Sequence, residues 1–215
     1  ILYLTLAAFL ISWLTPAKWK IQGFLIASIV SIFWLQPVLL IRNLDFWFPS
    51  AAILLTLITW IITQQTPVSS LKSFWATWAI LALTIIGLAV LRYLGPFCCL
   101  TASRPPPISS IAIYLLISFC LAWLASFFSK QKATRYALIW VIIGLLIIQK
   151  SPHLSEYASV ILRKTTGQDV NLASALDISW LGFSYLAFRL LHVLQDANTG
   201  RLGKVSLSNF LVYAL

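Results

Sequence analysis

The segment 108–128, ISSIAIYLLISFCLAWLASFF, is a run of 21 residues without a charged side chain. A helix rises about 1.5 Å per residue and the hydrocarbon core of a bilayer is about 30 Å thick, so this segment is long enough to cross a membrane. A helix also satisfies every backbone hydrogen-bonding group within the segment, as hydrocarbon requires. The alternation of polar and apolar residues typical of a β-barrel strand is missing. We therefore expect a membrane-spanning helix.

Similar apolar runs lie on both sides of this segment. Short breaks that contain proline, glycine or basic residues separate them. Runs of about 20 apolar residues are typical of spanning helices. The sequence thus predicts an all-α fold, a polytopic integral membrane helical bundle of about seven to eight helices. The runs cover residues 1–14, 21–41, 46–63, 74–94, 108–128, 136–148 and 178–195, and a further run opens at Ser206.

The composition of the chain supports the same class. Of its 215 residues, 60% are hydrophobic and 9% are charged, and the mean hydropathy is +0.93. Soluble domains carry about 25% charged residues, so this chain could not cover a surface that faces water. The net charge of +10 comes from basic residues scattered between apolar runs. Because they form no basic stripe, we expect them at lipid headgroups, and we expect no nucleic acid among the partners.

Residues 151–177 differ from the rest of the chain. Charged residues such as Glu156, Arg163 and Lys164 alternate there with Leu154 and Ile161. This spacing favours a helix that lies in the membrane interface and does not cross it. We therefore divide the chain into N-terminal transmembrane helices at 1–150, an interfacial amphipathic segment at 151–177, and a third part at 178–215.

The run 178–195 is the most informative for function. On a helix, Arg189, His192 and Asp196 follow at spacings of three and four and share one face, and Ser184 and Tyr185 lie one turn earlier. Ionisable groups inside a membrane are costly and are candidates for function. We expect this face to pack on other helices or on a water-filled cavity, and we take these five residues as a candidate substrate-binding face. Alternatively, Arg189 and Asp196 reach headgroups and pair locally, and His192 is a packing residue.

The same region resembles the signature segment of the membrane-bound O-acyltransferase (MBOAT) family. The resemblance rests on Gly182, Ser184, Phe188 and Asp196, followed by a short basic loop and the stretch 206–213. In that family an aromatic residue and a glutamine precede the aspartate. Here Arg189 stands in place of the glutamine, and His192 replaces a common aromatic. The match covers about 40 residues, and the rest of the chain matches only as a series of apolar helices.

The resemblance implies transfer of an acyl group from a thioester donor, such as acyl-CoA or an acyl carrier protein, to a hydroxyl acceptor. The histidine typical of the family would lie beyond residue 215, so we assign no catalytic residue within this chain. The family resemblance also implies that the protein is surrounded by membrane lipid, has other membrane proteins as further partners, and is located in the bacterial inner (plasma) membrane. No motif for a metal or a nucleotide cofactor is present, and we expect the thioester to be a co-substrate and no cofactor to be bound.

Two other function classes remain open. The chain could be a non-catalytic subunit of a larger membrane complex, in which polar groups hold helices together. It could also be a transporter in which Arg189, His192 and Asp196 form a relay for protons or ions. The chain opens at Ile1 and stops at Leu215, both within apolar runs, and contains no methionine. We therefore expect it to be a piece of a longer protein.

Overall fold

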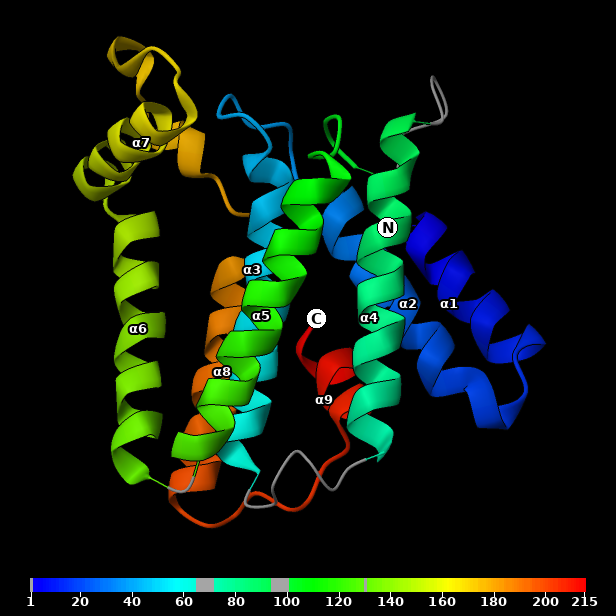
Figure 1. Cartoon of the computed structure of the whole chain (residues 1–215). Coiled ribbons are helices and arrows are strands. Elements are labelled where there is room, and N and C mark those ends of the chain that lie inside the picture. The colour runs from blue at the N-terminus through cyan, green and yellow to red at the C-terminus, as the bar shows by residue number, and fades with distance from the viewer. Residues whose placement is uncertain (1, 65–71, 94–100, 130) are drawn as a thin grey trace.

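A computed structural model describes residues 2–64, 72–93, 101–129 and 131–215 (Figure 1). The described residues form helices, turns and loops, and no β-strand occurs among them. The all-helical part of the expectation is thus confirmed. The α-helices are α1 (Leu2–Leu14), α2 (Lys20–Trp34), α3 (Leu44–Thr63), α4 (Lys72–Val90), α5 (Ile108–Phe128), α6 (Lys132–Lys150), α7 (Pro152–Thr166), α8 (Phe183–Asn198) and α9 (Leu207–Ala214).

Four of these helices are long and apolar enough to cross a membrane. They are α3, α4 with the 3-10 turn that extends it to Tyr93, α5 and α6. The other helices of the described chain have 16 residues or fewer, which is short of the about 20 that a span needs. The structure therefore supports a membrane protein with four candidate spans, and the expected seven to eight spanning helices are not confirmed.

Two of the predicted helices are shorter than their apolar runs. The run 21–41 is helical only as far as Trp34, because Pro37 has no backbone N–H and disfavours a helical residue before it. The run 178–195 becomes an α-helix at Phe183, after a 3-10 turn and Gly182. Gly182 has a φ of 77°, a left-handed conformation that glycine adopts without strain and other residues rarely do. Hydropathy could not reveal these breaks, because the residues around them remain apolar.

Helix α3 is the centre of the bundle. Along its membrane-length stretch 72% of the residues are buried, against 11% for α6, which leaves most of its apolar side chains uncovered by the rest of the described chain. The buried hydroxyls of α3 are satisfied locally. Ser50, Thr56 and Thr59 each donate to the backbone carbonyl four residues earlier, at 2.8–2.9 Å. A polar side chain bonded in this way leaves no unpaired group in an apolar surrounding.

Most basic residues lie at the two ends of the bundle. The described segments 35–43, 101–107 and 151–182 are at one end, and the connection that follows α8 is at the other, near the start of α6 (Figure 1). Basic residues occur in both groups, including Arg42, Arg104 and Lys164 at the first end and Arg201 and Lys204 at the second. If the candidate spans cross a bilayer, this arrangement puts the charges of these segments near its two surfaces, where headgroup contacts are expected.

Helix α7 lies across the end of α6, at a steep angle to it (Figure 1). It is followed by two 3-10 turns, η5 (Val170–Leu172) and η6 (Ala175–Ile178). Arg163 of α7 and Asp177 of η6 form a buried ion pair, with 2.7 Å between Nε and Oδ2. The hydroxyl of Ser159 donates to the same oxygen at 2.6 Å. The segment 151–182 is thus held together by polar contacts in its interior.

Candidate functional site

Helix α8 is fixed at both ends by side chains of α6. The amide Nε2 of Gln149 donates to the carbonyl of Trp180 at 2.8 Å, just before α8 begins. At the other end, Nη1 of Arg135 donates to the carbonyl of Ala197 at 3.1 Å. The buried face of α8 carries apolar residues such as Leu186, Leu190 and Val193. Hydrogen bonds at the ends and apolar packing between them set the position of the candidate face.

Arg189 connects α8 to α9. Its guanidinium donates to the backbone carbonyl of Tyr213 and to the hydroxyl of Tyr185. The guanidinium carbon also lies 4.0 Å from the ring centre of Tyr185 and 5.0 Å from that of Tyr213. A cation this close to aromatic rings gains a favourable cation–π interaction. Arg189 therefore helps to hold α9 on α8.

His192 and Asp196 form a separate pair on the same side of α8. The distance from Nδ1 of the imidazole to Oδ2 of the carboxylate is 3.6 Å, and the contact is an ion pair when the imidazole is protonated. The His192 side chain is 72% exposed and that of Asp196 is 31% exposed. Within the described residues, Arg189 makes no ion pair with Asp196. The local pairing of these two residues that we considered is therefore not found.

The candidate face packs only in part against the other helices of the described chain, through the contact of Arg189 with Tyr213 of α9. Tyr185, Phe188 and His192 are exposed, and Ser184 is half-buried. Leu186, Leu190 and Val193 supply the packing surface instead, because burying a leucine stabilises the fold while burying a charge costs free energy. The structure thus places Arg189 against α9 and leaves Phe188 and His192 exposed.

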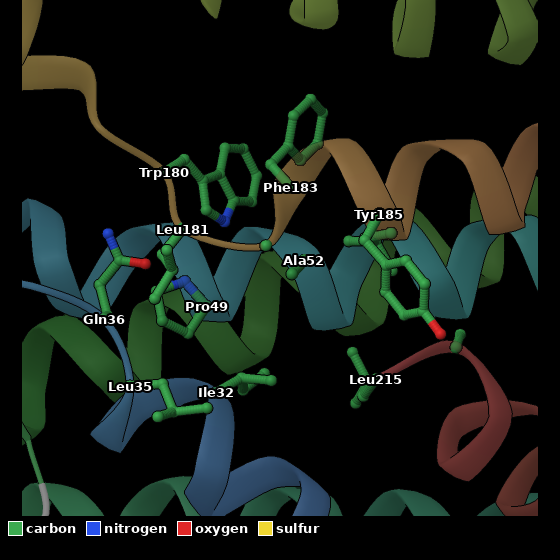
Figure 2. A pocket seen from close by; sticks show the side chains of 13 residues that line it. Ile32, Leu35, Gln36, Pro49, Ala52, Trp180, Leu181, Phe183, Tyr185 and Leu215 are labelled. Carbon is green, nitrogen blue, oxygen red and sulfur yellow. The ribbon is translucent and has the colours of Figure 1, made fainter. Parts of the chain in front are cut away.

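An apolar cavity lies at the N-terminal end of α8 (Figure 2). Its volume is about 160 Å³. Figure 2 shows Trp180 and Gln36 toward one end and Tyr185 toward the other, with Ile32 and Leu215 along the side opposite α8. Residues of α2, α3, α8 and α9 and of the adjoining loops line it: Ile32, Leu35, Gln36, Pro49, Ala52, Trp180, Leu181, Gly182, Phe183, Tyr185, Leu186, Ala214 and Leu215.

Gln36 is the one amide side chain in the cavity wall. It is 3% exposed, and its Nε2 donates to the carbonyl of Ser179 at 2.9 Å. Beside it, the ring of Trp180 stacks on Phe48 and on Phe183, with centroid distances of 4.7 and 4.2 Å. The stack gives the cavity a rigid wall. Sequence reasoning missed this site, although a single glutamine followed by proline within an apolar run was a signal for it.

The described residues contain no group of three or more His, Cys, Asp and Glu side chains that could hold a metal ion. Cys120 is a free, exposed thiol on α5. The adjacent Cys98 and Cys99 lie outside the described residues. The five candidate side chains on α8 offer one guanidinium, one imidazole, one carboxylate and two hydroxyls.

No protein-family model, no curated protein and no solved structure matches this chain.

Asp196→Asn should lower the activity of the complete protein more than Lys132→Ala. Asp196 lies beside His192 on the candidate face, whereas Lys132 is exposed at the first turn of α6. A partly exposed ion pair contributes at most about 1 kcal/mol, so neither variant should unfold the protein. The check is a comparison of the activity and the melting temperature of both variants. Wild-type activity of Asp196→Asn would remove the candidate face of α8 from the site.

Proposed function

We propose that this chain is the scaffold part of a membrane-embedded O-acyltransferase of the MBOAT type. The segment 182–213, which carries the resemblance, corresponds to α8 and α9, and these two helices are tied together through Arg189. The four candidate spans are consistent with a protein that works within the bilayer. The acyl donor in this proposal is a thioester, such as acyl-CoA or an acyl carrier protein, and the acceptor is a hydroxyl group.

The observation that carries the proposal is the apolar cavity beside the first turn of α8. A cavity of about 150 Å³ lined by aliphatic and aromatic side chains stays dry and can hold benzene. The cavity here has nearly the same volume and a mostly apolar lining, and it is partly open at the protein surface, so it suits a hydrocarbon segment of about six carbons at the end of a longer chain. In the proposal, it receives part of the acyl chain and keeps water away from it.

In the proposed reaction the acceptor oxygen attacks the thioester carbonyl, the carbon–sulfur bond breaks, and the thiol leaves with a proton. A general base assists the hydroxyl and polar donors stabilise the oxyanion. We assign neither role to a residue of this chain. Ser184, His192 and Asp196 are polar groups at the surface of α8 that could orient the acceptor. Arg189 and Tyr185 act in holding α8 and α9 together.

A non-catalytic membrane subunit is the second candidate function. The exposed Tyr185 and Phe188 on α8, at 60% and 66%, give this helix an aromatic surface that could meet another protein. A transporter, in which Arg189, His192 and Asp196 would form a relay for protons or ions, has less support. Arg189 contacts Tyr185 and Tyr213, and among the described residues only His192 pairs with Asp196, so the three ionisable groups do not form one chain.

The proposed function is tested by an acyl-transfer assay on the complete protein that contains this sequence. Purified protein in lipid receives a thioester donor labelled in its acyl group, together with a membrane extract as the source of acceptors. Label should appear in a product from which mild alkali releases the acyl group, as an ester requires. If the label stays on the donor while the protein co-purifies with other membrane proteins, the subunit function replaces the transferase.

A further inference from the structure

The inner face of α7 is polar. Ser155, Ser159 and Arg163 are 2%, 0% and 4% exposed, and their spacing of four residues places them on one side of the helix. The hydroxyl of Ser155 donates at 2.7 Å to the carbonyl of Ile148, in the last turn of α6. Ser159 and Arg163 both donate to the carboxylate of Asp177. These contacts determine which side of α7 points outward.

The outer face of α7 carries large apolar side chains. Leu154, Tyr157 and Ile161, at spacings of three and four, are 41%, 67% and 47% exposed. A surface helix of a water-soluble protein has the opposite arrangement, with apolar residues inward and polar residues outward. The turns after α7 add Leu172 and Leu176, which are 65% and 79% exposed. This surface needs an apolar environment outside the chain.

The position of α7 identifies that environment. Helix α6 is a candidate span that ends at Lys150, and α7 begins at Pro152 and crosses the end of α6 (Figure 1). Helix α7 therefore starts at the level where hydrocarbon gives way to headgroups. Lys150 and Lys164 are exposed nearby and can meet lipid phosphates.

We propose that α7 is a membrane anchor whose outer face, formed by Leu154, Tyr157 and Ile161, inserts among the lipid headgroups and upper acyl chains. The buried contacts of Arg163 and Asp177 hold the helix in that orientation. A helix of this kind lies in the plane of the interface, with its apolar side about 5–10 Å into the headgroup and acyl boundary. The proposal concerns lipid binding and does not depend on the acyltransferase function.

The test compares two exposed positions on α7. The three cysteines at 98, 99 and 120 are replaced by serine, and Ile161→Cys or Glu156→Cys is introduced as the single thiol. Glu156 is the matched control, because it is exposed on the same helix but lies about 140° around it from Ile161. Each variant is labelled with an environment-sensitive fluorophore and reconstituted alone in nanodiscs that contain phosphatidylcholine lipids with a nitroxide near the headgroup.

Quenching by the nitroxide lipid should be at least about twofold stronger for the label at 161 than for the label at 156. Because the belt of the nanodisc is the same for both variants and no other membrane protein is present, such a difference reports contact with lipid. Equal quenching at the two positions, or a label at 161 with the emission of a water-exposed dye, would overturn the anchor. The outer face of α7 would then be a surface for a protein partner.

Discussion

Replacing Asp177 by alanine is expected to lower the melting temperature of the protein in detergent by about 6–12 °C. The carboxylate is fully buried and accepts hydrogen bonds from Arg163, from Ser159 and from the backbone N–H of Ser174. Its removal leaves a buried guanidinium without its counter-ion, which is among the most damaging changes a core can undergo. The measurement is thermal unfolding of wild type and variant under identical conditions.

The matched control for this prediction is Asp169→Ala. Asp169 is exposed, and its Oδ1 accepts from the backbone N–H of Asn171 at 2.9 Å. Loss of such a cap should shift the melting temperature by only about 2–4 °C. Replacing both partners with apolar residues, as in Arg163→Met with Asp177→Leu, should recover much of the loss. Equal shifts for Asp177→Ala and Asp169→Ala would contradict the role of the buried pair.

Low pH should remove the stabilisation that the Asp177 carboxylate gives to the folded protein. Burial by itself raises the pKa of Asp177, but the hydrogen bonds from Arg163 and Ser159 and that from the Ser174 N–H lower it, and the net pKa lies below the ordinary 3.8. A lowered pKa means that the folded state favours the charged carboxylate. The stabilisation is therefore complete above pH 3.8 and is lost as the pH falls through the lowered value. This loss should be absent from the acid unfolding profile of Asp177→Asn.

The second large effect is expected for Arg189→Ala, which should detach α9 from α8. The variant loses charge-assisted hydrogen bonds to Tyr213 and Tyr185 and two cation–π contacts. Charged hydrogen bonds contribute about 1.5–3 kcal/mol each and cation–π contacts about 0.5–1 kcal/mol at exposed sites. Since the groups are partly exposed, we expect a total loss of about 2–3 kcal/mol. Hydrogen exchange of the peptide that contains α9 (Leu207–Ala214) should accelerate strongly.

Two further variants separate the contributions of Arg189. Tyr185→Phe removes the hydroxyl acceptor but keeps the ring, so exchange in α9 should rise only slightly. Arg189→Lys keeps the charge but cannot reproduce the planar contacts with both rings, and its effect should be intermediate. Unchanged protection of α9 in Arg189→Ala would show that apolar packing alone holds the two helices together.

The class of fold followed directly from hydropathy, because runs such as 108–128 leave no alternative to a helix in lipid. The number of spans did not. Within the apolar runs 21–41 and 178–195, Pro37 and the left-handed Gly182 interrupt the helical backbone. An average over 20 residues cannot detect such local breaks. The segment 151–177 forms α7 and two 3-10 turns, and its buried pair of Arg163 with Asp177 depends on tertiary structure, which spacing along the sequence does not reveal.

The candidate site could also be predicted from the sequence only in part. Helical spacing placed Tyr185, Arg189, His192 and Asp196 on one side of α8, and the structure agrees. Spacing could not show that Arg189 turns toward Tyr213, 24 residues later, because this contact forms between two helices. Gln36 was a sequence signal for one wall of the cavity, but its shape could not be predicted, because α2, α3, α8 and α9 form it together.

Narrowing the cavity with a larger side chain tests directly whether an acyl chain binds beside α8. Ala52 is buried on α3 and lines the cavity, and Ala112 on α5 is exposed. Ala52→Leu narrows the cavity, whereas Ala112→Leu makes the same chemical change on a face open to lipid. The measurement is transfer by the complete protein from thioester donors of increasing acyl-chain length. We expect Ala52→Leu to shift the preference toward shorter chains and Ala112→Leu to match wild type. Identical chain-length profiles for all three proteins would contradict an acyl site beside α8.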